Sequence, residues 1–428
     1  MLSIYRFLTF SLYPFFIFLI YFRLILKKED PKRYKEKIFP SAFNPTRDKN
    51  KKLIWFHAAS IGETLSILPL VEEINSLNKN VEFLITTVTL SSANLLKKRK
   101  KRHNVKHRFF PLDTEYLSNK FLNIWKPDLI CFVDSEIWPN FLFKIKEKKI
   151  PLVLINGRIT KKTFKRWNVL AQFSKKVFNN FDLCLACSEE SKSNLEKLHV
   201  KKVFCSGNLK FGIKITKENL SILNIKVLNT FKVWCAASTH EGEESIAIKT
   251  HMEIKKKYNN VLTIIIPRHI NRVSHIQNLA KKFNLNSQIL DNDDLINDGG
   301  GILIINSFGE SHKYFNYCKD IFIGKSLIKK LNLVGGQNPI EAAKLNCKIY
   351  FGPYVYNFQD VYSFLEINNM AEQVSNEHDL SSKIIKSFEN PKKTEHQNIN
   401  LLNDYGNKIL QHTIVELNKL LKIKNENS

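Results

Sequence analysis

Residues 55–63, "WFHAASIGE", and residues 234–241, "WCAASTHE", decide the fold, because they repeat one pattern in two halves of the chain. Each starts with a tryptophan in an apolar run and continues as Ala-Ala-Ser-x-x-Glu. An apolar run that ends on small residues and a helix-starting Ser predicts a buried strand followed by a helix. The repeat therefore predicts two similar α/β domains.

Further apolar runs alternate with polar or helix-periodic stretches after each repeat. Alternation of this kind predicts a parallel sheet covered by helices. The runs are "VEFLITTVT" (81–89), "LICFVDSE" (129–136), "PLVLING" (151–157) and "LCLACSE" (183–189) in the first half, then "VLTIIIPRH" (261–269), "GILIINS" (301–307), "DIFIGKS" (320–326) and "KIYFGP" (348–353).

These patterns predict a domain order for the whole chain. We expect an N-terminal membrane anchor at 1–26, a Rossmann-like domain at 27–212, a polar linker at 213–230 and a second Rossmann-like domain at 231–428. The second domain is expected to end in an amphipathic helix within 400–428. Two such domains would face a cleft.

The anchor is predicted from residues 7–22, "FLTFSLYPFFIFLIYF", which carry no charge. This run is slightly shorter than the roughly 20 residues of a spanning helix, and Pro14 lies in its middle. The basic residues follow the apolar run, which argues against a cleavable signal peptide and predicts that the rest of the chain stays in the cytoplasm. Whether the segment spans the bilayer or lies in its interface stays open.

Composition excludes a disordered chain and a disulfide scaffold. The 428 residues are 43% hydrophobic, enough for a large core. The seven cysteines are scattered, as in proteins of a reducing compartment, and Cys184 and Cys187 are expected to be structural thiols in a strand. The net charge of +26 fits an anionic membrane, an acidic substrate or nucleic acid. Part of it is concentrated in "KKRKKRHNVKHR" (97–108) and "KKTFKR" (161–166).

Glu63 has two interpretations. In the first, Ser60 and Glu63 form a capping box that starts a helix. In the second, Glu63 is a catalytic base at the carboxyl edge of a parallel sheet, where open α/β folds bind their ligands. The residues alone favour the cap.

Other motifs are expected at the same edges. "DSEIWPN" (134–140) adds two carboxylates after a strand, and "SGNLKFG" (206–212) brings Lys210 next to the domain boundary. In the second half, Arg268 follows a strand, and "GGQNPIE" (335–341) resembles a helix start that attracts phosphate, with Asn338 as a cap. The sequence contains no phosphate-binding loop of the Walker type, and "DNDD" (291–294) is expected to be a loop rather than a metal site.

Taken together, "HAASIGE", "DSEIWPN", "SGNLKFG", "AASTHEGEE", "PRH", "GGQNPIEAA" and "GPYVYNF" resemble the Kdo transferases of lipopolysaccharide biosynthesis. The resemblance implies a GT-B fold, with the acceptor on the first domain and the CMP-sugar donor on the second. It implies metal-independent, inverting transfer of 3-deoxy-D-manno-octulosonic acid (Kdo) from CMP-Kdo to the lipid A precursor, lipid IVA. The enzyme would work at the cytoplasmic face of the inner membrane and need no cofactor.

The resemblance also implies roles for individual residues. Glu63 falls on the catalytic base, and Asp134, Glu136 and Lys210 fall on groups that stabilise the transition state. The implied donor site comprises Pro267, Arg268, Phe308, Gly309, Glu310, Gly336, Asn338, Pro339, Ile340 and Glu341. Three positions depart from the family pattern: Asp134 replaces a Glu, Lys325 replaces a Gly, and Gln337 replaces a His.

Two rival functions remain from the sequence. One is another membrane-associated GT-B enzyme that uses a UDP-sugar. The other is a membrane-tethered nucleic-acid-binding protein that relies on the basic clusters, although no known binding module accompanies them. If the acceptor is a lipid phosphate, the same clusters at 97–108 and 161–166 serve to bind it.

Overall fold

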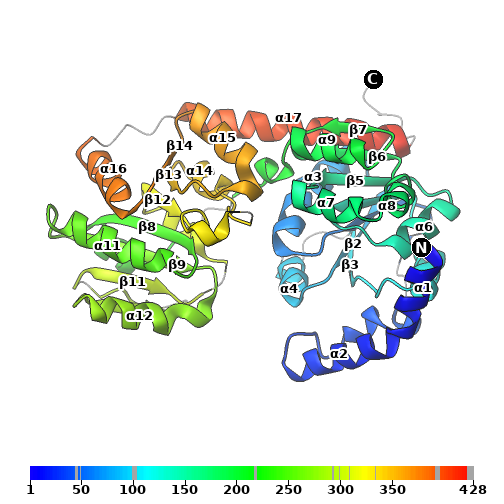
Figure 1. The fold of residues 1–428 in the computed structure, drawn as a ribbon, viewed down its shortest axis with the longest axis horizontal. Helices are drawn as coiled ribbons and strands as arrows, with labels where there is room; N and C mark the ends of the chain where they lie inside the picture. Colours follow the sequence, from blue (N-terminus) through cyan, green and yellow to red (C-terminus); the bar gives the residue numbers. More distant parts are fainter. Residues whose placement is uncertain are drawn as a thin grey trace. The chain divides into compact units, whose positions relative to one another are not determined.

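The computed structural model divides the chain into two compact units (Figure 1). Unit 1 comprises Met1–Ile213 and Tyr405–Ser428, and unit 2 comprises Lys214–Asp404. The structure describes all residues except 44–46, 49, 99–103, 216–218, 292–293, 298, 308, 333, 391–395 and 422–428.

Unit 1 is built on a seven-stranded sheet in the order β3-β2-β1-β4-β5-β6-β7, in which all neighbouring strands are parallel. The order reverses between β1 and β4, as in Rossmann-like folds. The strands are β1 Lys52–His57, β2 Val81–Thr87, β3 Val105–Phe109, β4 Leu129–Val133, β5 Leu152–Gly157, β6 Leu183–Ala186 and β7 Val203–Cys205.

Helices connect these strands, and several begin on a side-chain cap. The hydroxyls of Ser60, Thr114, Thr160 and Ser188 each accept a hydrogen bond from a main-chain N–H in the first turn of α3, α5, α7 and α9. The connecting helices are α3 Ile61–Leu77, α4 Leu90–Lys98, α5 Glu115–Trp125, α6 Pro139–Glu147, α7 Lys161–Asn168, α8 Ala171–Phe178, α9 Glu189–Lys197 and the 3₁₀ helix η3 Leu209–Gly212.

The core of unit 1 is strongly aromatic. The Trp55 ring lies within 4.9–6.1 Å of the rings of Phe110, Phe121, Phe132 and Phe141. Trp55, Phe121, Phe132 and Phe141 are fully buried, and Phe110 is nearly so. This cluster fixes β1 and β4 against α5 and α6, and so positions the residues that follow both strands.

Unit 2 repeats the plan with a second seven-stranded parallel sheet in the order β10-β11-β9-β8-β12-β13-β14. Its strands are β8 Lys232–Thr239, β9 Val261–Pro267, β10 Ser287–Leu290, β11 Gly301–Ile305, β12 Asp320–Ile323, β13 Lys348–Phe351 and β14 Ala371–Gln373. Its helices are α10 Ile222–Leu228, α11 Glu243–Lys255, η4 Ile270–Arg272, α12 Val273–Lys282, α13 Ser311–Phe315, η5 Lys329–Leu331, α14 Ile340–Lys344, η6 Tyr356–Phe358, α15 Gln359–Ile367 and α16 Glu377–Glu389.

Two predicted domain boundaries are wrong in part. The amphipathic helix near the C-terminus is present as α17 His396–Leu421, but from Tyr405 onward it belongs to unit 1 rather than to the second domain. The Tyr405 ring packs edge-on against Phe211 at 5.0 Å, and Lys52 Nζ donates to the Leu421 carbonyl at 2.6 Å. The predicted linker contains α10, and Asn224 in α10 fastens it to unit 2 through the Asp294 carbonyl.

The predicted anchor forms two helices of unit 1, α1 Leu2–Ser11 and α2 Tyr13–Ile25. Among the described residues, no single helix is long and apolar enough to cross a membrane. The two helices pass that test only as a pair, and they are bent by 49° relative to each other. Lys27 (φ +54°) then ends α2, with the Lys27 and Lys28 amides donating to the Leu24 and Arg23 carbonyls.

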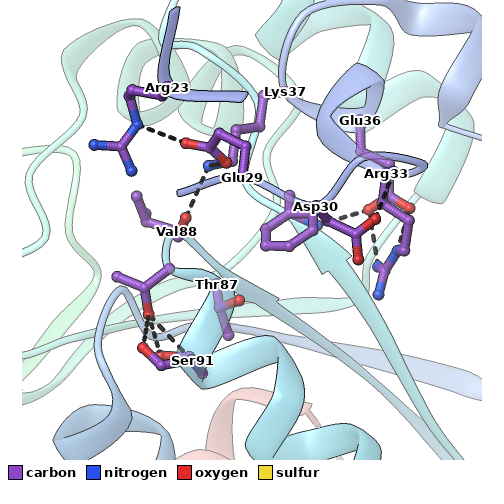
Figure 2. Close-up of polar contacts among 12 residues, drawn as sticks. Arg23, Glu29, Asp30, Arg33, Glu36, Lys37, Thr87, Val88 and Ser91 are labelled. Atoms are coloured by element: carbon purple, nitrogen blue, oxygen red, sulfur yellow. Dashed lines mark hydrogen bonds and ion pairs between the residues drawn. The ribbon is translucent and has the colours of Figure 1, made fainter. Parts of the chain in front are cut away.

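The segment after α2 is fixed to the sheet by buried ion pairs (Figure 2). The Glu29 carboxylate accepts from Arg23 Nε at 2.7 Å and from Lys37 Nζ at 2.5 Å, and Lys37 also donates to the Val88 carbonyl beyond β2. Only 2% of the Glu29 side chain and 7% of the Lys37 side chain are exposed. Burial lowers the pKa of Lys37, and its contacts with Glu29 oppose that shift.

We predict that Glu29→Gln lowers the free energy of unfolding of unit 1 by about 3 kcal/mol, because it leaves the buried Lys37 ammonium without its counter-charge. Urea unfolding followed by tryptophan fluorescence measures this, since Trp55, Trp125, Trp138 and Trp167 lie in unit 1.

The matched control is the double variant Glu29→Gln/Lys37→Met, which removes both charges. It should recover a large part of the lost stability. A single variant as stable as the wild type would contradict the importance of this buried pair.

Candidate functional site

The sequence-predicted acidic residues of unit 1 gather where the strand order reverses. Glu63 lies in the first turn of α3 after β1, and Asp134 and Glu136 follow β4, the neighbour of β1. Parallel strands share one carboxyl edge, so the side chains meet there, as the sequence predicted. The contacts below show what each can do.

Glu63 is both a cap and a partly buried carboxylate. Its Oε2 accepts from the Ala59 amide at 2.8 Å, and its Oε1 accepts from the Ser60 hydroxyl at 2.7 Å. The Glu63 amide in turn donates to Ser60 Oγ at 3.3 Å. The predicted capping box therefore exists, but it closes on the Ala59 amide instead of the Ser60 amide.

The pKa of Glu63 is raised above the ordinary range of a glutamate. Burial is the largest cause, and the neighbouring carboxylates of Asp134 and Glu136 raise it further. The hydrogen bonds from Ser60 and Ala59 lower it without cancelling the increase. The cap therefore does not prevent this carboxylate from being a stronger base than an exposed glutamate.

Glu136 is held ionised by a buried relay that the sequence did not reveal. The Trp55 indole donates to Thr86 Oγ1 at 2.9 Å, and His57 Nδ1 lies 3.0 Å from the same oxygen and 3.2 Å from the Thr86 carbonyl oxygen. On the other side of the ring, His57 Nε2 donates to Glu136 Oε2 at 3.1 Å. Trp138 Nε1 donates to the same oxygen at 2.8 Å.

These donors decide the charge of Glu136. Burial raises its pKa, but the contacts with His57 and Trp138 outweigh that effect, so the pKa lies below its usual value. Two nearby glutamates are thus shifted in opposite directions, Glu63 upward and Glu136 downward. Such a separation is typical of groups with different roles in one reaction.

The backbone conformation at Asp134 explains why an Asp replaces the Glu of the family pattern. Its backbone has φ +59°, in the left-handed region that Asp and Asn tolerate better than most residues. Ser135 Oγ donates to its Oδ1 at 3.1 Å, and the Arg158 amide donates to its carbonyl at 3.1 Å. An aspartate therefore suits this turn by its backbone conformation.

Lys210 lies in η3, which packs against α3, the helix that carries Glu63. The loop is fixed by Asn156, whose Oδ1 accepts from the Leu209 amide at 2.9 Å, and by Asn208, whose Oδ1 accepts from the Lys210 amide at 3.1 Å. The structure thus places Lys210 on an element that packs against the helix carrying Glu63.

In unit 2 the repeated motif has a different use. The sequence pattern aligns Glu63 with Glu241, but Glu241 is exposed and Glu243 is fully buried. Glu243 accepts from the amides of His240, Lys325, Ser326 and Leu327 at 2.6–3.0 Å. Four main-chain donors occupy this carboxylate, so it joins the ends of β8 and β12 instead of acting as a base.

Cationic and imidazole side chains gather at the carboxyl edge of the second sheet. Burial lowers the pKa of His240, and the charges of Lys325, His269 and Arg268 lower it further, so all four groups are close. Arg268 follows the buried Pro267 at the end of β9, and its amide donates to the Thr239 carbonyl of β8 at 3.0 Å. This edge suits an anionic ligand, as predicted, but His240 and Lys325 were not predicted to take part.

The glycine-rich loop is fastened to the same edge. The Gly336 amide, at φ +94°, donates to the Lys325 carbonyl at 2.7 Å. A Cβ at Gly335 would lie 1.9 Å from the Tyr354 carbonyl oxygen, so only glycine fits there. Gln337, the third departure from the family pattern, accepts from the Tyr362 hydroxyl through its own carbonyl, which does not depend on its side chain.

Asn338 caps the helix start with its side chain, as predicted, but Pro339 takes the N-cap position instead of the first helical position. Helix α14 starts at Ile340 with Pro339 as its N-cap residue, and Asn338 Oδ1 accepts from the Ile340 amide at 3.2 Å. Glu341 does not close a box with Asn338. Its carboxylate faces Ser311 Oγ at 3.5 Å and His312 Nδ1 at 3.7 Å, and burial raises its pKa.

Of the predicted turn 308–310, Glu310 lies directly before Ser311, the residue that faces Glu341. Glu310 forms an ion pair with Lys313 at 3.0 Å, just before Ser311, and Gly309 has φ +86°. Phe308 lies outside the described residues. Over the described ranges, no group of three His, Cys, Asp or Glu side chains could share a metal ion.

The basic cluster 97–108 is only partly exposed where it is described, because residues 104–108 are half-buried. Lys106 pairs with Glu82 at 3.0 Å, Arg108 lies over the Trp125 ring, and burial lowers the pKa of His107 to about 3. Lys97 and Lys98 are exposed, and 99–103 lie outside the described residues. The cluster at 161–166 suits the predicted binding of lipid phosphates better than the cluster at 97–108 does. Helix α7 exposes Lys161, Lys162, Lys165 and Arg166 just after β5.

The cysteines fit the prediction of structural thiols in part. All seven are free, and Cys184 is buried in β6. Cys187 lies just after that strand and is only partly buried.

We predict that Lys325→Gly raises the melting temperature slightly and weakens the binding of CMP, the ligand that the resemblance implies. Lys325 has φ +60°, a backbone conformation that costs an L-residue about 1–2 kcal/mol and glycine almost nothing. The substitution also removes one positive charge from the proposed anion-binding site. Thermal melts and calorimetry measure the two effects.

Lys27→Gly is the matched control, because Lys27 has a similar φ of +54° and lies in unit 1. It should give a similar gain in stability with unchanged CMP binding. Equal CMP affinity of Lys325→Gly and wild type would show that Lys325 does not belong to the anion-binding site.

Comparison with known proteins gives the same family. A family model described as 3-deoxy-D-manno-octulosonic-acid transferase (kdotransferase) matches residues 32–213. A 3-deoxy-D-manno-octulosonic acid transferase of Rickettsia bellii is 31% identical over 420 residues, which cover 95% of this chain and 98% of that one. Another from Haemophilus influenzae is 26% identical over 378 residues, 86% of each chain.

Solved structures support the fold. The crystal structure of a UDP-N-acetylglucosamine 2-epimerase from Listeria monocytogenes, described as putative, matches with a TM-score of 0.60 over 88% of this chain and 98% of that one. At 12% identity this likeness concerns the fold alone, and it agrees with the predicted GT-B arrangement of two Rossmann-like domains. Because the sequence relationship extends along nearly the whole of both chains, this chain belongs to the 3-deoxy-D-manno-octulosonic acid (Kdo) transferases, glycosyltransferases of lipopolysaccharide biosynthesis.

Proposed function

We propose that this enzyme transfers Kdo from CMP-Kdo to a hydroxyl of the lipid A precursor, with inversion and without a metal ion. Glu63 removes the proton from the acceptor hydroxyl as its oxygen attacks the anomeric carbon of Kdo. The bond from that carbon to the CMP phosphate breaks, and CMP leaves with the electron pair. Metal independence would require protein cations to take the charge of the leaving phosphate.

The raised pKa of Glu63 is the observation that carries this proposal. A buried carboxylate with acidic neighbours holds a proton more strongly than an exposed one, and two donors fix its orientation. Glu136, kept ionised by His57 and Trp138, supplies negative charge near the electron-poor anomeric carbon of the transition state. Asp134 and Lys210 complete this acceptor-side group in the roles that the resemblance implies.

Unit 2 supplies the groups that suit the donor. Arg268, Lys325 and His240 lie together at the ends of β9, β12 and β8, where a phosphate would be stabilised. The loop from Gly336 to Glu341 is fastened beside them through the Lys325 carbonyl. We therefore place the CMP moiety of the donor on unit 2, with Pro267, Gly309, Glu310, Asn338, Pro339 and Ile340 as further lining residues.

We also propose that the enzyme works on the cytoplasmic face of the inner membrane. The acceptor is a lipid that carries phosphates, and the N-terminal helices expose many apolar side chains. The exposed lysines and arginine of α7 follow β5 at the edge that carries Glu63, where they suit the acceptor phosphates. Membrane attachment would keep enzyme and acceptor on one surface.

Glu63→Gln tests the base directly. The amide can keep both cap contacts, since its oxygen accepts from Ala59 and its NH₂ can donate to Ser60 Oγ once the hydroxyl rotates. We expect transfer to fall about 100- to 10,000-fold with unchanged melting temperature and CMP affinity. Rates come from CMP release with CMP-Kdo and lipid acceptor.

The matched control is Glu73→Gln, the same substitution on the same helix, where the carboxylate pairs only weakly with Gln411 at 3.4 Å. It should retain full activity. A Glu63→Gln enzyme with near wild-type transfer would reduce Glu63 to a cap and move the search for the base to Asp134 or Glu136.

The raised pKa of Glu63 predicts a pH dependence with a defined sign. Only the carboxylate form can accept the proton, so kcat/KM should fall as the pH drops through this pKa. Asp134 raises the pKa of Glu63 by its negative charge, so Asp134→Asn should move the acid limb of the profile to lower pH. Asn tolerates the left-handed backbone at this position, which preserves the turn.

The pH profile of kcat/KM separates this effect from any simple loss of rate. A lower maximum with a shifted acid limb is the expected result. An acid limb that stays in place or moves to higher pH would show that Asp134 does not act on the base.

A further inference from the structure

The two N-terminal helices are fixed to unit 1 along one continuous side. The partly or fully buried positions recur at helical spacing in both helices, so a single stripe faces the domain. These positions are Leu2, Tyr5, Arg6, Thr9, Tyr13, Phe16, Ile17, Ile20, Arg23 and Leu24.

Polar contacts hold this stripe in place. The Tyr5 hydroxyl donates to Asp113 Oδ2 at 2.7 Å, and the Tyr13 hydroxyl donates to the Ile38 carbonyl. Arg6 pairs with Glu115 at 3.0 Å. Removal of α1 from the domain would expose Asp113, which is buried and has a pKa raised by burial to about 6. The helices are therefore a built part of unit 1.

The opposite side of both helices is apolar and uncovered. Phe7 is 67% exposed, Phe10 76%, Phe15 57%, Phe18 66% and Ile25 77%. This outer face carries no charge between residues 7 and 22. A continuous aromatic and aliphatic face of this kind marks a surface that is covered in the working protein.

The segment that follows gives the outer face a positive border. Its glutamates, Glu29 and Glu36, are buried and paired internally, as Figure 2 shows for the Arg23–Glu29–Lys37 and Arg33–Glu36 contacts. The exposed side chains of the segment include Lys27, Lys28, Lys32 and Lys35. The ion pairs therefore hide both glutamates, and Asp30, which is partly buried, accepts from the Lys32 and Arg33 amides. The exposed charges of the segment are thus mainly lysines, which complements an anionic surface and repels a second copy of this face.

The helices also lie at the edge of the sheet that carries the catalytic carboxylates. Lys37 is bonded to the Val88 carbonyl just beyond β2, and Tyr5 reaches Asp113 beyond β3. Asp113 in turn accepts from the Asn140 amide at the start of α6, close after Glu136. Hydrogen bonds through Asp113 thus connect α1 with the start of α6, the helix that follows the loop of Glu136.

We propose that α1 and α2 lie in the plane of an anionic lipid bilayer, at the boundary between headgroups and acyl chains, and do not cross it. The outer face enters the apolar boundary, the lysines contact anionic headgroups, and the inner stripe stays on the protein. This inference rests on the membrane attachment proposed above and adds the orientation of the helices. Because α1 and α2 are fixed to unit 1, they would hold the carboxyl edge of its sheet at a fixed distance from the lipid.

The geometry disfavours a spanning arrangement. With about 1.5 Å per residue, the 10 residues of α1 and the 13 of α2 reach about 15 and 20 Å, less than a hydrocarbon core of roughly 30 Å. Even with the 49° bend the pair reaches about 30 Å from end to end, but it could span only if it left its contacts with Asp113, Glu115 and Ile38. That step would break contacts that the in-plane arrangement keeps.

Depth-dependent fluorescence quenching tests the in-plane arrangement. Phe10→Trp and Phe18→Trp each place an indole on the outer face of the full-length protein, one on α1 and one on α2. The vesicles contain phosphatidylcholine with a minority of phosphatidylglycerol and carry bromine at shallow or deep acyl positions. Ile367→Trp, at a site 80% exposed in unit 2, is the matched control, and the wild-type signal is subtracted.

In-plane helices should give the same shallow depth for both indoles, with stronger quenching by shallow bromines and none for the control. A spanning pair would separate the two indoles by on the order of 10 Å in depth, with one quenched best by deep bromines, and that result would overturn the proposal.

Flotation with the same vesicles tests membrane attachment separately from the in-plane arrangement of the helices. Lys27→Gln/Lys28→Gln/Lys32→Gln should bind anionic vesicles on the order of 100-fold more weakly at low salt and neutral vesicles equally. Wild-type protein that does not float, or that dimerises through this face without vesicles, would refute both the membrane attachment and the in-plane position of α1 and α2. Kdo transfer to a detergent-dispersed acceptor would still test the proposed activity on its own.

Discussion

The burial of acidic side chains at the carboxyl edge of one parallel sheet is the constraint on which the rest of unit 1 depends. Ionised carboxylates are costly to remove from water, so each must be supplied with donors or change its pKa. Glu136 accepts hydrogen bonds from His57 and Trp138 and stays ionised. Glu63 receives two donors that do not fully compensate its burial, and its pKa rises. One edge thus holds two neighbouring glutamates whose pKa values are shifted in opposite directions.

The aromatic core is part of that arrangement. The Trp55 ring packs against four phenylalanines, and its indole N–H starts the relay through Thr86 and His57 to Glu136. A residue that is fully buried for packing therefore also takes part in the hydrogen bonds that hold His57 beside Glu136. The second unit uses the same strand–helix plan differently. Main-chain amides occupy the Glu243 carboxylate, and the charged groups that gather at the carboxyl edge of this sheet are the cations Lys325 and Arg268.

Much of this organisation could be predicted from the sequence. The central strands are long apolar runs, and Glu63, Asp134, Glu136, Lys210 and Arg268 lie in motifs that follow or border them. The edge strands were not predicted: β3 is the mixed segment "VKHRF", and β7, β10 and β14 have three or four residues each. Such strands form because a neighbouring strand offers hydrogen bonds, which periodicity does not record.

Tertiary contacts explain the other differences. The repeated Ala-Ala-Ser-x-x-Glu pattern points to Glu241, but Gly242, with φ +95°, delays the start of α11 and brings Glu243 to the amides of a loop about 80 residues away. The attachment of α17 to unit 1 depends on the Phe211–Tyr405 contact, and no local pattern encodes it. The positive φ of Lys325 and Asp134 becomes visible only in the folded backbone.

The most direct measurement of the central claim is mass spectrometry of the lipid product. The purified full-length protein is incubated with CMP-Kdo and the lipid A precursor in the presence of a chelator. The account predicts a lipid heavier by one or more whole Kdo residues, with one CMP released for each. A lipid of unchanged mass, or sugar transfer that occurs with a UDP-sugar and not with CMP-Kdo, would contradict it.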